Sequence, residues 1–184
     1  MKATMDLAYR LQHIIFGEHS EWFWLMAQAI IILVSAILIY RQVRVQRYAN
    51  LLQMLTKMRE TWDSPSMLQH RQAACGNYQS GSKKINAAEG QVLGFFEEMA
   101  LLLRKGVLEE EFVWVTYSYF IEHYWSMLEA NIKEYRLTTK DESWFEEMER
   151  LRKVIGKVSK RKNLPSADKT HLEITTFIDG ELSP

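Results

Sequence analysis

The stretch WFWLMAQAIIILVSAILIY, residues 22–40, decides how this chain is organised. It holds nineteen residues and no charged side chain, and ten of them are Leu, Ile, Val or Phe. A helix of this length extends about 28 Å, close to the roughly 30 Å hydrocarbon core of a bilayer. The ten apolar side chains together favour insertion by roughly 3–6 kcal/mol. We therefore expect residues 22–40 to form a single transmembrane helix.

Aromatic side chains mark both ends of this run. Trp22, Trp24 and Tyr40 lie where a membrane helix meets the headgroup region, which favours amphipathic rings. The buried core helix of a soluble protein is an alternative, but such helices are usually shorter and carry a polar side. A cleaved signal peptide is disfavoured, because the apolar run is long, begins late and is not followed by a small-residue cleavage site.

The charges that flank the run predict its orientation. Arg41, Arg44 and Arg47 follow it closely, whereas the two bases before it stand further away. Because positive residues stay on the cytoplasmic side, we expect residues 1–21 to be a short extracytoplasmic N-terminus. The C-terminal part would then lie in the cytoplasm, with the chain in the plasma membrane. The single cysteine, Cys75, fits that reducing compartment.

The formal net charge is zero, but the charges form blocks. Residues 41–88 carry eight basic and two acidic side chains, residues 89–149 carry five and fourteen, and residues 150–169 carry eight and one. The basic run 157–162 suits a solvated helix end, anionic lipid headgroups or nucleic acid. A solvated helix end is the commonest explanation of such a run, and on a membrane-tethered chain the headgroups are closer than nucleic acid. We expect the lipid bilayer, through the membrane helix, as a partner and do not expect nucleic acid.

Residues 41–158 have the apolar spacing of a small cytoplasmic helical domain. We expect the membrane helix to continue to about Trp62. Ser64 suits the N-cap of the next helix, which should reach about Cys75 before a polar loop at 76–84. Apolar side chains of the continuing helix form a seam of about two heptads, which favours packing within its own domain over a homodimeric coiled coil. The seam consists of Tyr48, Leu51, Leu55, Met58 and Trp62.

Three more helices are expected before the tail. Asn86 opens the first of them, and Gly106 closes it. An acidic run begins a long central helix that ends near Leu137. After a turn in which Asp141 is a candidate cap, the last helix ends near Val158.

The remaining residues, 159–184, are predicted to be a disordered tail. Within them HLEITTFI, residues 171–178, has the composition of a strand, but no other segment offers a partner strand. The predicted fold class is therefore all-α, a single transmembrane helix followed by a small helical bundle.

The segment VLGFFEEMALLLRKGVLEEEFVWVTYSYFIEHYWSMLEANIKEYR, residues 92–136, resembles a bacterial family of unknown function. The elements that carry the resemblance are FFEEMALLL, the turn KGVLEEE, the pair formed by Tyr124 and Trp125, and Arg136. The resemblance implies one N-terminal transmembrane helix joined to a helical domain. It implies no activity, and no functional residue is carried over from it.

No catalytic, cofactor-binding or metal-binding motif stands out. Helical carboxylate-bridged metal sites place Glu three residues before His, and none of the five histidines has that neighbour. Glycine-rich phosphate-binding motifs are absent. The aromatic run 112–125 is a candidate ligand groove, but such a run on a helix is more often core. We therefore expect no enzyme activity and no cofactor.

Two hypotheses follow for the function. The favoured one is a membrane-anchored helical interaction or scaffold module that binds a protein partner through its cytoplasmic domain. The alternative is a membrane-tethered enzyme or sensor with an unrecognised site near Glu97, Glu98, Glu122 and His123. The alternative requires these four side chains to converge in one pocket, and the favoured hypothesis does not.

Overall fold

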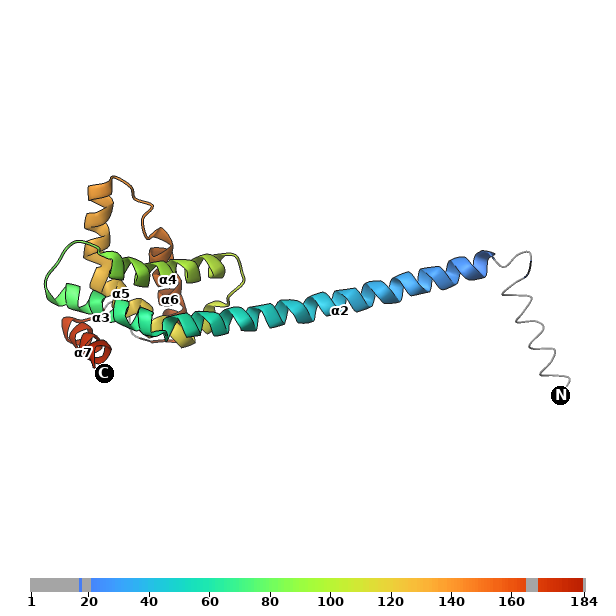
Figure 1. Cartoon of the computed structure of the whole chain (residues 1–184), viewed down its shortest axis with the longest axis horizontal. Coiled ribbons are helices and arrows are strands. Elements are labelled where there is room, and N and C mark those ends of the chain that lie inside the picture. Colours follow the sequence, from blue (N-terminus) through green and yellow to red (C-terminus); the bar gives the residue numbers. More distant parts are fainter. Residues whose placement is uncertain (1–16, 18–20, 165–168, 184) are drawn as a thin grey trace. The chain divides into compact units, whose positions relative to one another are not determined.

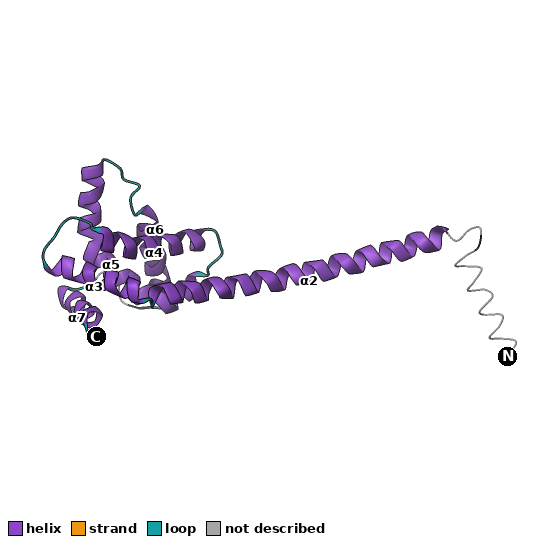
Figure 2. Ribbon diagram, viewed as in Figure 1, coloured by secondary structure: helices purple, strands orange, loops and turns teal. Residues whose placement is uncertain are grey.

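A computed structural model of the chain describes residue 17, residues 21–164 and residues 169–183 (Figure 1). Every regular element in these ranges is an α-helix (Figure 2), which confirms the predicted all-α class. The chain divides into two compact units, Met1–Gln53 and Met54–Pro184. Apart from Gly17 and Glu21, the predicted extracytoplasmic segment 1–21 lies outside the described residues.

Helix α2, Glu21–Trp62, contains 42 residues and includes the whole apolar run 22–40. It is long and apolar enough to cross a membrane, and none of its most apolar stretch is buried within the chain. The helix continues past the run without interruption, as predicted. Its last nine residues, 54–62, belong to the second unit.

The second unit is a helical bundle in which the end of α2 is followed by five further helices. Helix α4 packs against both α3 and α6, α5 packs along α6, and α7 packs against α3 and α5. These helices are α3 Pro65–Gln79, α4 Ala87–Arg104, α5 Glu110–Thr139, α6 Glu146–Arg161 and α7 His171–Leu182.

Aromatic side chains from α2, α4 and α5 form the centre of the bundle. Phe96 and Tyr124 are fully buried, and Trp62 is 3% exposed. The Trp62 ring lies 4.9 Å from the Phe95 ring and 5.1 Å from the Phe96 ring, measured between centroids. Burying one such side chain stabilises a fold by about 1.5–3 kcal/mol. Of the aromatic run of α5, Tyr117, Tyr124 and Trp125 are buried in this core, whereas Tyr119 is 54% exposed.

Three of the predicted local signals lie at helix ends in the structure. The Ser64 hydroxyl accepts a hydrogen bond from the N–H of Met67 at 3.1 Å and caps α3. Asn86 and Glu89 cap α4 reciprocally, each side chain accepting from the backbone N–H of the other. Gly106, with φ of +68°, follows the end of α4 and donates its N–H back to the last turn of that helix.

Some predicted boundaries differ from those observed. Helix α3 continues to Gln79, through the first part of the loop expected at 76–84. The compact unit begins at Met54 within α2, whereas the helical domain was expected from residue 41. Of the predicted heptad seam, only Met58 and Trp62 are buried. The last two residues of the seam, Met58 and Trp62, therefore pack within the bundle. A homodimer stays a prediction.

The prediction of a disordered tail is wrong for most of the described residues beyond 158. Helix α6 extends to Arg161, and residues 171–182 form helix α7 rather than a strand. Ile174, Phe177 and Ile178 are buried on one face of α7. The tail is helical because α3 and α5 supply an apolar surface for that face.

Candidate functional site

The four residues nominated by the sequence lie in two separate places. Glu97 on α4 lies beside the start of α6, where the backbone N–H groups of Glu147 and Met148 donate to its carboxylate. Helix α6 has no side-chain cap of its own, because its N-cap residue is Phe145. Burial raises the pKa of Glu97 above its ordinary value despite these donors. Glu98 is exposed. Glu97 therefore serves as a helix cap supplied by a neighbouring helix.

Glu122 and His123 lie on α5, against the segment that leads into α7. Glu122 pairs with Lys169 at 2.7 Å, and their side chains are only 10% and 17% exposed. His123 Nδ1 lies 2.6 Å from the carbonyl oxygen of Tyr119, and its ring stacks on Phe177 with centroids 4.7 Å apart. Burial lowers the pKa of His123 below its ordinary value, so the neutral ring is favoured. These contacts hold α7 in place.

The pocket that the enzyme hypothesis requires is therefore not formed by these four residues. Glu97 faces α6, whereas Glu122 and His123 face the entry to α7. Nor do the described residues contain any group of three or more His, Cys, Asp or Glu side chains that could hold a metal ion.

A buried polar cluster lies between α3, α5 and α7. Arg71 of α3 forms an ion pair with Glu181 of α7 at 3.1 Å, and their side chains are 12% and 7% exposed. The Arg71 guanidinium also lies 4.7 Å from the centroid of the Trp62 ring. The hydroxyl of Tyr124 faces both Cys75 and Glu181. Burial raises the pKa of Cys75 to about 12, so this thiol stays protonated and is a poor nucleophile.

The sequence did not single out Arg71 or Glu181. They are far apart along the chain, and neither belongs to a motif. One signal was available, because Ile174, Phe177 and Ile178 recur at helical spacing and Glu181 follows at the next position of the same face. That pattern predicts an amphipathic helix with one buried carboxylate.

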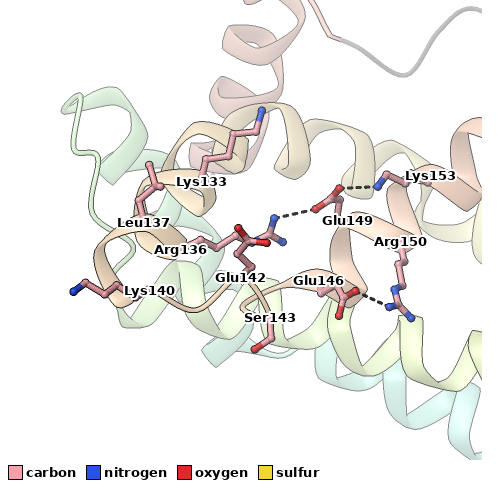
Figure 3. A pocket seen from close by; sticks show the side chains of 10 residues that line it. All are labelled: Lys133, Arg136, Leu137, Lys140, Glu142, Ser143, Glu146, Glu149, Arg150 and Lys153. Atoms are coloured by element: carbon pink, nitrogen blue, oxygen red, sulfur yellow. Dashed lines mark hydrogen bonds and ion pairs between the residues drawn. The ribbon is translucent and has the colours of Figure 1, made fainter.

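An open groove of about 950 Å³ lies at the corner where α5 leads into α6 (Figure 3). Charged side chains of both signs dominate its walls. The lining residues are Lys133, Arg136, Leu137, Lys140, Glu142, Ser143, Glu146, Glu149, Arg150 and Lys153.

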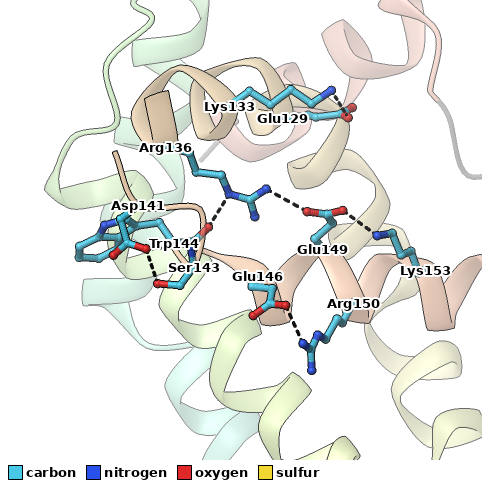
Figure 4. Close-up of polar contacts among 10 residues, drawn as sticks. All are labelled: Glu129, Lys133, Arg136, Asp141, Ser143, Trp144, Glu146, Glu149, Arg150 and Lys153. Carbon is cyan, nitrogen blue, oxygen red and sulfur yellow. Dashed lines mark hydrogen bonds and ion pairs between the residues drawn. The ribbon is translucent and has the colours of Figure 1, made fainter. Parts of the chain in front are cut away.

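Most of these charges pair with one another (Figure 4). Arg136 donates from Nε to the carbonyl oxygen of Trp144 at 2.8 Å and from Nη1 to Glu149 at 2.9 Å. Lys153 donates to the other carboxylate oxygen of Glu149 at 2.7 Å. Hydrogen bonds from Lys153 and Arg136 hold the pKa of Glu149 below its ordinary range. Arg136 Nε, Arg136 Nη1 and Lys153 are thus bonded within the chain, and Arg136 stabilises the corner.

The corner itself contains two residues in the left-handed region, Lys140 with φ of 55° and Phe145 with φ of 58°. Between them, one carboxylate oxygen of Asp141 accepts hydrogen bonds from the N–H and the hydroxyl of Ser143, at 2.9 and 2.7 Å. The sequence suggested Asp141 as a cap of α6. In the structure Asp141 instead stabilises the turn before that helix.

Two residues of the basic run 157–162 form ion pairs within the bundle. Arg161 pairs with Glu110 at 2.5 Å, and Lys162 pairs with Glu111. The Lys162 ammonium also lies 4.7 Å from the centroid of the Trp114 ring. Cations at the end of α6 and acids at the start of α5 each suit the dipole of their own helix. These pairs fasten the two helices together.

Comparison with known proteins identifies the family. No curated protein and no solved structure shows significant similarity to the chain. The profile of a domain of unknown function, DUF4760, matches residues 25–154, which run from the apolar part of α2 into α6. The matched segment includes residues 92–136, which carry the resemblance noted in the sequence, and it ends before α7. Because the match spans well over half of the chain, this protein belongs to the DUF4760 family.

Proposed function

We propose that this protein is a single-pass, membrane-anchored helical module that binds or organises protein partners and has no enzyme activity. The observation that carries the proposal is the exposed apolar run of α2. Residues 22–40 hold no charge, and none of the most apolar stretch is buried within the chain. Ile31 and Leu33, for example, are 65% and 62% exposed. A contiguous apolar surface of this kind marks contact with a membrane or another protein.

Large apolar side chains of the bundle are buried, in contrast to those of the run 22–40. Among them are Phe96, Leu128 and Ile155 at 0% exposure. The second unit therefore forms its own hydrophobic core, whereas the most apolar stretch of α2 is not buried within the chain. A helical segment that is apolar on all sides requires an apolar environment, and the apolar run 22–40, about 28 Å long, matches the hydrocarbon core of a bilayer.

The flanking charges support a cytoplasmic bundle. Arg41, Arg44 and Arg47 follow the apolar run within α2, and positive residues beside a membrane helix remain on the cytoplasmic side. In this proposal the chain lies in the plasma membrane with residues 1–21 outside.

The polar side chains of the bundle support a binding role over catalysis. The Cys75 thiol is buried, the Glu97 carboxylate caps α6, and Glu122 is paired with Lys169. Each of these groups has a structural task, and they do not face one cavity. A nucleophile, a base and an orienting group in mutual contact would be needed for catalysis.

Membrane integration tests the anchor. Replacing Ile32 and Leu33 together with Arg places two charges near the centre of the span, each at a cost of about 2.5–3.5 kcal/mol on the insertion scale. We expect the variant to be extracted from membranes by alkaline carbonate, whereas the wild type is retained. The matched control replaces Val43 and Val45 with Arg on the same helix outside the run, and it should be retained. Retention of the Ile32 and Leu33 variant would refute the anchor.

Topology needs a reporter thiol other than Cys75, because that thiol is fully buried. Val115→Cys places a thiol on α5 at a position where the native side chain is 67% exposed. We expect a membrane-impermeant maleimide to label this variant only after the membrane is permeabilised. The wild type, with Cys75 alone, should stay unlabelled in both conditions. Labelling of Val115→Cys in intact cells would reverse the proposed orientation.

A further inference from the structure

Helix α7 lies outside the matched family domain and covers a surface of that domain. It packs against α3 and α5, and its buried positions are Ile174, Phe177, Ile178 and Glu181. Counted from Ile174, these are positions i, i+3, i+4 and i+7. The same spacing is used by amphipathic helices that insert one face into a groove of another protein.

Phe177 is the aromatic anchor of this face. Its ring stacks on His123 with centroids 4.7 Å apart and meets Tyr124 edge-on at 5.1 Å. The ring is also 5.7 Å from Tyr119 and 6.4 Å from Phe120. One phenyl ring thus fills an aromatic pocket on α5, the kind of buried anchor that dominates the affinity of helix-in-groove interfaces.

Two buried ion pairs of opposite polarity flank the anchor. Arg71 pairs with Glu181 in the last turn of α7, and Glu122 pairs with Lys169 just before its first turn. The groove therefore presents a cation at one end and an anion at the other. Reversing the helix would bring like charges together in a place with little water, so the pairs fix both position and direction.

Helix α7 depends on the groove for its own stability. It has only 12 residues, and isolated helices of that length are marginal in water. Its interior contains Thr175, Thr176 and Gly180, which all have weak helix propensity. The capping box of Thr170 and Glu173 offsets this only in part. Folding of α7 and its docking are therefore coupled, and such segments open more readily than the core around them.

We propose that the groove between α3 and α5 is a helix-recognition site of this family member, occupied in the resting chain by its own α7. Its external ligand would be an amphipathic helix of a partner protein with the same pattern. That pattern is three apolar anchors at i, i+3 and i+4, a carboxylate at i+7 and a cation five residues before the first anchor. This proposal rests on the proposed role as an interaction module and names the surface and the partner chemistry.

The tether explains why the ligand is a different protein and not a second copy. Residues 162–170 connect α6 to α7, and a short connection of this kind gives a cis segment an effective concentration in the millimolar range. The α7 of a second copy has the same intrinsic affinity and lacks that advantage. A partner helix displaces α7 only when its own affinity is higher.

Peptide exchange tests the site in the full chain. A protease recognition sequence is inserted after Ser166, and the purified protein is cut in detergent after it has folded. The probe is a fluorescent peptide of residues 169–183. We expect saturable binding to the cut protein after its tail fragment has been removed, and binding at least about tenfold weaker to the uncut chain, whose tethered α7 competes.

Peptide variants leave the protein unchanged, so misfolding of the bundle does not obscure the result. Phe177→Ala and Glu181→Gln should each weaken binding by about tenfold or more, because one empties the aromatic pocket and the other leaves Arg71 without its counter-charge. Leu172→Ala is the control, since Leu172 is 76% exposed and should not contribute. A peptide in which every exposed position is replaced and the pattern is kept should still bind.

Three outcomes would overturn the proposal. They are no saturable binding to the cut protein, equal binding of the Glu181→Gln peptide, and dimers of the uncut chain that exchange α7. The last would make a second copy the occupant. The experiment requires no bilayer, so its failure leaves the membrane anchor standing, and failure of the carbonate test leaves the groove standing.

Discussion

Phe96→Ala is the change that best tests the bundle as a folded unit. Phe96 lies on α4 and is fully buried. Its ring centroid is 5.1 Å from that of Trp62, 5.6 Å from that of Phe95 and 6.0 Å from that of Tyr124. The substitution leaves a cavity at the point where three helices meet.

The expected cost follows from this environment. Truncating a buried Phe to Ala costs about 3–5 kcal/mol, and ring pairs contribute about 0.5–1.5 kcal/mol beyond area burial. Since Phe96 has three ring neighbours, we expect about 4 kcal/mol. A unit of roughly 130 residues unfolds with an entropy of about 0.28 kcal/mol/K, so the midpoint should fall by about 15 °C.

Thermal unfolding of the full chain in detergent, followed by near-ultraviolet circular dichroism, measures this shift. The signal reports aromatic packing and is insensitive to the helix content of α2. Leu101→Ala on the same helix is the control, because Leu101 is 37% exposed. A shift of less than about 4 °C for Phe96→Ala, equivalent to about 1 kcal/mol, would mean that the aromatic centre does not stabilise the bundle.

Three further substitutions test the cap, the corner and the histidine. Asn86→Ala removes the capping box of α4 and should cost about 1 kcal/mol in chemical denaturation. Arg136→Gln removes the bonds to Trp144 and Glu149 and should cost about 2 kcal/mol, whereas Arg150→Gln in an exposed pair should have no measurable effect. The folded-state pKa of His123 is lowered, so its stabilising contribution is present above the unfolded pKa of about 6.5 and is lost as the pH falls from there toward the folded pKa. His123→Gln keeps a hydrogen-bond donor, and its stability should lack this acid-side loss when both proteins are unfolded between pH 7.5 and 5.5.

The sequence predicts best those features that depend on neighbours along the chain. The apolar run of α2 is continuous, and the caps at Ser64, Asn86 and Gly106 are each specified within a few residues. The aromatic face of α5 has helical spacing, which identifies it as core. In each case the physical cause lies within one or two helical turns, so a single sequence contains it.

Features that depend on distant contacts were missed. Helix α7 has weak propensity and acquires its conformation from the surface of α3 and α5, so its composition suggested disorder or a strand. The extra turn of α3 was missed for a comparable reason. Residues 76–79 are polar and include Gly76, so their composition suggested a loop. The four nominated site residues do not share a location, because Glu97 on α4 faces α6, whereas Glu122 and His123 on α5 face the entry to α7, and a single sequence does not show which faces of distant helices meet.

Trp62 and Arg71 explain why the i+7 carboxylate matters in the proposed recognition. Trp62 closes the aromatic centre on one side, and the Arg71 guanidinium covers its ring at 4.7 Å. With α7 docked, Glu181 supplies the counter-charge that this buried cation needs. A helix that fills the aromatic pocket without a carboxylate would leave Arg71 desolvated and unpaired, at a cost that exceeds the value of several apolar contacts. In the proposed recognition, the penalty of a buried cation would therefore exclude apolar helices in general, and the aromatic pocket that holds Phe177 would supply the affinity.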